Sequence, residues 1–224
     1  MGADPVGERV TDVADRLRGA TGIFGGTFDP IHTAHLAVAE AARDTFGLRR
    51  VLFIPAPQPP HKPGRVITAV EHRLAMVEAA VAANAAFEVS RIEVDRAGPS
   101  YTVDTLAALC EDHPNDRLAL ILSAESYSEL STWHEPRRIL ELADLIVAPR
   151  DGYPEADPAL VPSQFPDAPA AIAFLDGPHI RLSASEIRGR AADGRSVRYL
   201  VPDAVAAYIG DHGLYQDHRR DHRT

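Results

Sequence analysis

The sequence contains almost no cysteine. Cys110 is the only cysteine among the 224 residues, which excludes an internal disulfide and a zinc site built from several cysteines. Such scarcity is typical of proteins from a reducing compartment. No apolar run approaches the roughly 20 residues that a membrane-spanning helix needs, and the charged start of the chain lacks the apolar core of a signal peptide. We therefore expect a cytoplasmic protein that does not contact a membrane.

Basic residues are also in short supply. Asp and Glu number 32 against 23 Lys and Arg, which gives a formal net charge of −9. A protein that binds duplex DNA usually carries a basic face, so we expect a small substrate and no nucleic-acid partner. A basic pocket inside an acidic surface remains compatible with this total. The length and the 45% hydrophobic content suffice for one large domain, acting alone or as a homo-oligomer.

Apolar runs alternate with segments of helical spacing along the chain. Strands are predicted at residues 22–24, 51–55, 87–89, 118–122 and 145–148, and helices at or within residues 33–46, 70–84, 102–109, 136–143, 182–188 and 205–209. The run 118–122 is apolar throughout, as in a strand whose two faces are both buried. This alternation predicts βαβ units and a parallel sheet of the α/β class.

Residues 149–179 have a different composition. They hold seven prolines and a single short strand candidate at residues 171–175. A long connection of this kind within a compact domain is often functional or mobile. We expect one domain at residues 21–215. It is preceded by residues 1–20, a tail or a short amphipathic helix, and followed by a C-terminal tail at residues 216–224.

The string GGTFDPIHTAH, from Gly25 to His35, carries the most chemical information. Glycines directly after a strand let the backbone approach a phosphate closely. A helix that begins near His32 directs free N–H groups and a favourable dipole toward an anion. His32 and His35 share one face of that helix, where two imidazoles could hold a polyphosphate and stabilise charge on a leaving group. The alternatives are a capped helix with two surface histidines, or a metal site, for which no third ligand has a suitable local spacing.

A second string, LSASEIR at residues 182–188, places hydroxyl groups about one helical turn before an arginine. Hydroxyl side chains at a helix start are also ordinary N-caps, and capping alone would explain Ser183. The two strings together resemble the GGTFDPxHxGH and ISSTxIR signatures of the nucleotidyltransferase superfamily of adenylyl- and cytidylyltransferases. Ala34 replaces the usual glycine of the first signature, and Ala184 replaces a serine of the second.

This resemblance implies a Rossmann-like, doubly wound parallel sheet with its ligand at the carboxyl ends of the strands. It also implies the residues of the site. ATP is expected to bind Gly25, Gly26, Thr27, Phe28, His32, His35, Ser183, Ser185, Ile187 and Arg188, and the catalytic residues among them are His32, His35 and Arg188.

Three segments in the middle of the chain resemble the bacterial nicotinate-nucleotide adenylyltransferases in particular. These are QPPHK at residues 58–62, PSYTVDTL at residues 99–106 and TWH at residues 132–134. The resemblance implies that Lys62 meets phosphate on the acceptor and that Thr102 and Trp133 bind its pyridine ring. Read alone, these residues would be a solvated lysine, an N-cap and a packing residue. Ser123 and Glu125 stand where this family usually has Gly and Asp.

The implied reaction is the transfer of AMP from ATP to nicotinate mononucleotide, which yields deamido-NAD and pyrophosphate in NAD biosynthesis. Mg²⁺ is expected to arrive on the phosphates of ATP, without a metal site built by the protein. Two alternatives stay open. One is transfer to another acceptor, such as nicotinamide mononucleotide or phosphopantetheine, and the other is a paralogue that binds nucleotides without turnover.

Overall fold

A computed structural model describes residues 13–57 and 67–216 of the chain. Six parallel strands form one sheet in the order β3-β2-β1-β4-β5-β6. The strands are β1 (Thr21–Gly26), β2 (Arg50–Pro55), β3 (Phe87–Val89), β4 (Leu118–Ser123), β5 (Asp144–Ala148) and β6 (Ile172–Phe174). The order reverses between β1 and β4, and ligands of such sheets bind at this switch point. The predicted doubly wound fold is confirmed.

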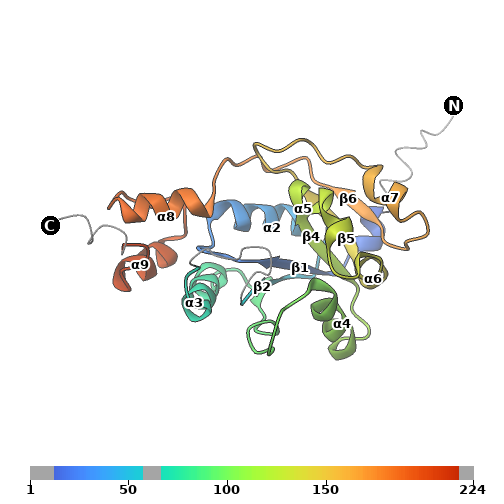
Figure 1. Cartoon of the computed structure of the whole chain (residues 1–224), viewed down its shortest axis with the longest axis horizontal. Helices are drawn as coiled ribbons and strands as arrows, with labels where there is room; N and C mark the ends of the chain where they lie inside the picture. The colour runs from blue at the N-terminus through green and yellow to red at the C-terminus, as the bar shows by residue number, and fades with distance from the viewer. Residues whose placement is uncertain (1–12, 58–66, 217–224) are drawn as a thin grey trace.

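Helices cover both faces of the sheet, with α2 and α4 on opposite sides (Figure 1). They are α2 (Thr33–Phe46), α3 (Val70–Val81), α4 (Thr102–Asp112), α5 (Ala124–Ser128), α6 (Pro136–Leu142), α7 (Leu160–Gln164), α8 (Ala184–Ala192) and α9 (Asp203–Asp211), with a short 3₁₀ helix η1 (Leu130–Thr132). Successive strand residues point to opposite faces. Ile121 therefore packs in the same core cluster as α2, whereas Leu120 packs in the cluster that contains α4 and α6. In the described part of the chain, no helix combines the length and hydropathy needed to cross a membrane.

The predicted elements agree closely with the observed ones, but α5 and η1 were not predicted and the bounds of several helices differ. The helix predicted at residues 70–84 ends at Val81. There, the side chain of Asn84 accepts a hydrogen bond from the backbone N–H of Ala86 at 3.0 Å, forming a turn that competes with the helix. The segment 149–179 contains α7, which the sequence pattern did not predict, as well as β6 at the predicted place.

The segment before β1 contains a short helix. Residues 13–17, within the segment 1–20 that was predicted to be a tail or a short amphipathic helix, are helical. Leu17 and Ala20 are buried in the core cluster that contains α2. Arg16 forms an ion pair with the buried Asp144 at 2.7 Å. The folded domain therefore begins before residue 21.

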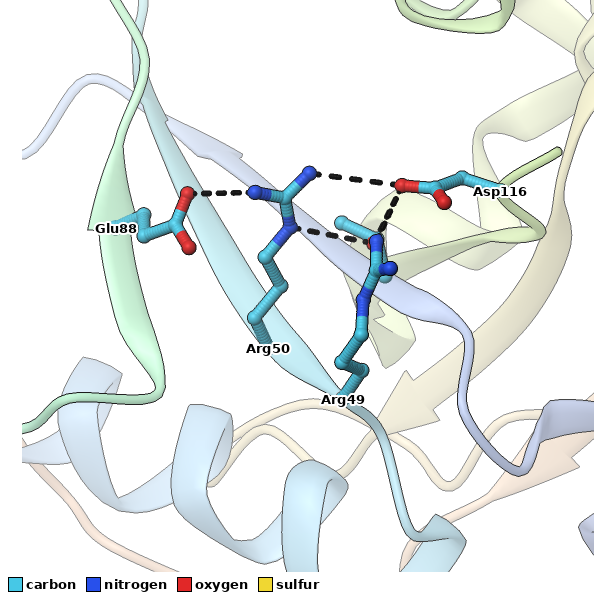
Figure 2. Close-up of polar contacts among 5 residues, drawn as sticks. Arg49, Arg50, Glu88 and Asp116 are labelled. Carbon is cyan, nitrogen blue, oxygen red and sulfur yellow. Dashed lines mark hydrogen bonds and ion pairs between the residues drawn. The ribbon is translucent and has the colours of Figure 1, made fainter. Parts of the chain in front are cut away.

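A charged network joins the amino ends of the strands, at the edge opposite the switch-point cleft. Figure 2 shows Arg50 between Glu88 and Asp116, and the corresponding N–O distances are 2.7 Å and 3.5 Å. Arg49 also pairs with Asp116, and both arginines donate to the hydroxyl of Thr21. The network links β1, β2, β3 and the start of β4, so we interpret this edge as structural.

Candidate active site

A cleft of about 830 Å³ opens at the carboxyl ends of β1, β4 and β5. Its size is typical of small-molecule sites, which occupy roughly 300–1,000 Å³. The cleft brings together the two signature strings, which lie near opposite ends of the chain. The predicted site residues that line it are Gly25, Gly26, Thr27, Phe28, His32, His35, Trp133, Ser183, Ser185 and Arg188.

Three predicted site residues are not among the cleft-lining residues. Ile187 is fully buried in the core cluster beneath α8, so it anchors that helix. Thr102 is the first residue of α4, and Lys62 lies outside the described residues. The start of α4 does lie beside the segment of Trp133, because the ring of Tyr101 packs against that of His134 at 4.4 Å.

The glycines of the first string have different roles. A Cβ atom on Gly26 would lie 3.0 Å from the ring of Phe28, so a larger residue would displace that buried aromatic side chain. A Cβ atom on Gly25 would meet nothing within 4 Å. Gly25 therefore leaves its backbone accessible to a ligand. Phe28 itself has a φ of 46°, in the left-handed region that non-glycine residues rarely adopt.

The two histidines form one unit at the start of α2. The backbone N–H of His32 donates to Nδ1 of His35 at 3.2 Å. Since Nδ1 accepts this bond, the proton of the neutral His35 ring resides on Nε2. The two rings stack with their centroids 3.6 Å apart, and the rings of Phe24 and Phe28 meet His35 edge-on.

This environment keeps both imidazoles neutral at pH 7. Burial, followed by repulsion from Arg150, lowers the pKa of His32 from 6.5 to about 4. Burial, followed by repulsion from His32 and Arg150, places the pKa of His35 well below 6.5. Nδ1 of His32 is buried and has no hydrogen-bond partner among the described residues. The pair can therefore exchange hydrogen bonds with a ligand without carrying a permanent charge.

The second string is connected directly to the first. Ser183 caps α8 by accepting a hydrogen bond from the backbone N–H of Glu186 at 3.1 Å. This confirms the capping role and leaves the hydroxyl proton of Ser183 able to donate elsewhere. Arg188 donates to the Ser185 hydroxyl at 3.1 Å and to the backbone carbonyl of Asp29. These bonds hold the guanidinium at the cleft wall.

Arg150, which follows β5 and lines the cleft, was not predicted from the sequence. Its guanidinium forms an ion pair with Glu125 and lies 4.8 Å from the ring centroid of Tyr153. Glu125 itself is not among the described cleft-lining residues. The available signal was a basic residue directly after the carboxyl end of a central parallel strand, where ligands of this fold bind.

Arg73 is a second residue that the sequence analysis missed. It is fully buried on α3, and its guanidinium donates to the backbone carbonyls of Thr27, Ala56, Pro57 and Thr68 at 2.6–2.8 Å. Four hydrogen bonds satisfy the buried charge. Arg73 thereby joins the loop after β1 to the chain that leaves β2 and enters α3.

Trp133 combines the two roles that the sequence left open. It is partly buried against the core cluster that contains α4 and α6, and it also lines the cleft. An aromatic ring in this position can stack on a planar ligand ring while its inner edge contributes to packing. The geometry therefore allows the predicted contact with a pyridine ring.

Comparison with known proteins agrees with this architecture. Residues 23–190 match the cytidylyltransferase-like family. The probable nicotinate-nucleotide adenylyltransferase of Thermomicrobium roseum is 48% identical over 195 residues, which are 87% of this chain and 91% of the relative. The protein of the same name from Roseiflexus castenholzii is 49% identical over 198 residues, which are 88% of this chain and 98% of the relative.

Solved structures share the fold. The nicotinic acid mononucleotide adenylyltransferase of Plasmodium falciparum complexed with NaAD has a TM-score of 0.72 at 18% identity, covering 88% of this chain and 98% of that one. The same protein complexed with APC gives a TM-score of 0.71. Because the family match covers most of the chain and the relatives are nearly half identical along most of its length, this chain belongs to the cytidylyltransferase-like family and, within it, to the nicotinate-nucleotide adenylyltransferases.

Proposed function

We propose that this chain transfers AMP from ATP to nicotinate mononucleotide, forming deamido-NAD and releasing pyrophosphate in NAD biosynthesis. The observation that carries the proposal is the stacked, neutral histidine pair, His32 and His35, in the same cleft as Arg188. The relatives at 48% and 49% identity bear the name of this activity, which supports nicotinate mononucleotide as the acceptor.

The triphosphate of ATP is placed between the two signature strings. Gly25 leaves its backbone accessible, and the start of α2 offers the positive end of the helix dipole. Ser183, Ser185 and Arg188, which line the same cleft, are proposed to bind the β- and γ-phosphates. Arginine suits this task because its planar group binds phosphate through two N–H donors.

The reaction requires no nucleophile from the protein. A phosphate oxygen of nicotinate mononucleotide attacks the α-phosphorus of ATP in line. One P–O bond forms to this oxygen while the P–O bond to the β-phosphate breaks, and the electron pair leaves with pyrophosphate. Nε2–H of His35 donates a hydrogen bond to the charge that develops during this transfer, and His32 packs against it. Catalysis therefore consists of positioning and of charge stabilisation by preorganised donors.

Mg²⁺ is proposed to accompany the triphosphate. Among residues 13–57 and 67–216, no group of three or more His, Cys, Asp or Glu side chains could hold a metal ion. Asp29, which lines the cleft, lies near Arg188, and Glu125 pairs with Arg150. This donor set fits an ion carried by phosphate oxygens and their waters. When bound, the ion would neutralise part of the phosphate charge.

The acceptor is proposed to lie on the side of Trp133. The indole would stack on the pyridine ring, and Thr102 at the start of α4 would face the ring carboxylate with backbone N–H groups. Lys62 is proposed to meet phosphate. Donors arranged for a carboxylate pair poorly with an amide NH₂, and a mismatch of this kind can strongly reject an analogue. We therefore expect a preference for the acid over the amide.

The test is pyrophosphate release from ATP and Mg²⁺ with a panel of acceptors: nicotinate mononucleotide, nicotinamide mononucleotide, phosphopantetheine and none. The proposal predicts release that depends on nicotinate mononucleotide and is slower with the amide. Equal efficiency with both mononucleotides would contradict the acid preference alone. ATP binding without product from any acceptor would contradict the proposed activity and favour a non-catalytic paralogue.

A further inference from the structure

The buried carboxylate of Asp29 connects Arg188 to the C-terminal part of the chain. One of its oxygens, Oδ1, accepts a hydrogen bond from the hydroxyl of Tyr215 at 2.9 Å. The other, Oδ2, accepts one from the backbone N–H of Thr68 at 3.4 Å and lies 3.8 Å from Nη1 of Arg188. Residues far apart in the sequence thus meet at one carboxylate that is only 5% exposed.

Tyr215 is placed at this carboxylate by the turn that follows α9. The backbone N–H of Leu214 donates to the carbonyl of Ile209 at 3.0 Å, which reverses the chain after the helix. Tyr215 itself has a φ of 69°, a conformation that residues other than glycine rarely adopt. Such conformations persist where surrounding contacts fix them, and the bond to Asp29 is a contact of this kind.

The hydroxyl of Tyr215 acts as a donor at neutral pH. Burial, followed by the adjacent charge of Asp29, raises the pKa of Tyr215. A protonated hydroxyl can therefore occupy one lone pair of the carboxylate permanently. This matters because the same carboxylate is also a natural partner for the guanidinium of Arg188.

The separation between Asp29 and Arg188 has a functional meaning. A bonded guanidinium–carboxylate pair has N–O distances of about 2.7–2.9 Å, whereas Nη1 of Arg188 lies 3.8 Å from Oδ2 of Asp29. Arg188 is held near the acid by the backbone carbonyl of Asp29 but is not captured by a two-bond ion pair. Its remaining N–H groups stay available to a phosphate in the cleft.

We propose that Tyr215 is a positioning residue that acts on Arg188 through Asp29. Its hydroxyl fixes the rotation of the carboxylate, which prevents Asp29 from rotating into a two-bond pair with Arg188 and withdrawing the guanidinium from the triphosphate. The inference rests on the proposed function for the role of Arg188 in binding ATP. It assigns the segment after α9 a part in forming the nucleotide site.

The test is a double-mutant cycle measured as ATP affinity by calorimetry in the presence of Mg²⁺ and without acceptor. Tyr215→Phe removes only the hydroxyl and should weaken ATP binding about five- to tenfold, an effect of the size of one ordinary hydrogen bond. In an Arg188→Ala background, the same change should alter affinity less than about twofold. Tyr208→Phe is the matched control, because its hydroxyl bonds to His72 at 3.0 Å and does not line the cleft. It should leave ATP affinity unchanged.

Each outcome decides the proposal. An equal loss of affinity in the wild-type and Arg188→Ala backgrounds, or no loss in either, would overturn it. If Tyr215→Phe fails to fold, Asp29→Asn replaces it: an amide cannot withdraw Arg188 into a two-bond ion pair, so ATP affinity should be retained, and a loss of more than about twofold would overturn the proposal. The cycle measures ATP binding without acceptor, so it does not depend on turnover. A wild-type chain that binds ATP but forms no dinucleotide would contradict the proposed reaction. The cycle would still decide the role of Tyr215.

Discussion

The chemistry of the site depends on the protonation of two stacked histidines. Nδ1 of His35 already accepts the backbone N–H of His32, so a second ring proton would oppose that N–H at close range. Burial against Phe24 and Phe28 disfavours the charged ring as well. His35 is thus fixed as a neutral Nε2–H donor before any substrate arrives.

Replacing His35 by Ala should reduce kcat by about 100- to 1,000-fold, the usual cost of one preorganised donor to a transition state. The circular dichroism spectrum should stay unchanged, since the side chain points into the cleft. His113→Ala, at the end of α4, serves as the control and should retain full kcat. A loss below about threefold for His35→Ala would assign His35 a structural role only.

The lowered pKa of His32 also predicts how stability depends on pH. The pKa falls from 6.5 to about 4 on folding, so between these values the unfolded chain binds more protons than the folded one. Through His32 alone, stability should therefore decrease by about 2 kcal/mol between pH 7 and pH 5, and the lowered pKa of His35 adds to this decrease. Urea denaturation at both pH values measures this difference. The stability of His32→Gln should decrease less between these pH values than that of the wild type. An equal decrease in both would contradict the lowered pKa of His32.

Trp133 tests the acceptor side of the cleft. Trp133→Ala should raise KM for nicotinate mononucleotide by the equivalent of about 1–3 kcal/mol, as for loss of aromatic stacking on a base. KM for ATP should stay nearly constant, because the triphosphate is proposed to bind residues of the two signature strings and not Trp133. Steady-state kinetics with each substrate varied in turn measures both values. Equal damage to both, or an unfolded variant, would show that packing is the main role of Trp133.

At the scale of elements, periodicity and apolar runs predicted most of the fold. Every predicted strand exists, and α2 has the predicted bounds. The end of α3 and the existence of α7 were missed because side-chain contacts decide them. Asn84 closes a turn after α3, and Val161 of α7 is buried and donates a hydrogen bond to the hydroxyl of Tyr127. Neither contact has a periodic signature in the sequence.

The same reasoning explains which site residues could be found in advance. The two strings predicted His32, His35 and Arg188 as site residues, and the fold brings all three to one cleft. Arg150 and Tyr215 act through partners distant in sequence, and only the folded chain shows these pairings. Ile187 was predicted to bind ATP as part of a string, but an apolar residue within a helical motif is more readily explained by core packing.

Arg73 shows how one side chain connects elements around the site. Its four bonds to backbone carbonyls require the planar fork of a guanidinium. Arg73→Met should leave these buried carbonyls unpaired and lower the free energy of unfolding by about 3–5 kcal/mol. Arg138→Ala, which breaks an exposed pair with Glu141, should cost less than about 1 kcal/mol. Urea denaturation measures the free energy of unfolding of both variants. Similar losses in the two variants would contradict the role of Arg73.

On the scale of the whole molecule, charge is distributed unevenly. The chain carries a net charge of −9, yet Arg150, Arg181 and Arg188 all line the cleft. Asp29, Asp151 and Glu186 line the same cleft, so its basic and acidic side chains are equal in number, and individual guanidinium groups would hold a phosphate. The acidic composition indicated a small substrate, and the cleft offers these arginines to a polyanionic one.

The most direct test of this account is the identity and stoichiometry of the products formed from ATP and nicotinate mononucleotide. The purified chain would be incubated with both substrates and Mg²⁺, and the quenched mixture analysed by mass spectrometry and pyrophosphate assay. The account predicts one deamido-NAD and one pyrophosphate for each ATP consumed. The His35→Ala variant should form both products much more slowly than the wild-type chain. Conversion of ATP to ADP or AMP without a dinucleotide, or consumption of no ATP at all, would contradict it.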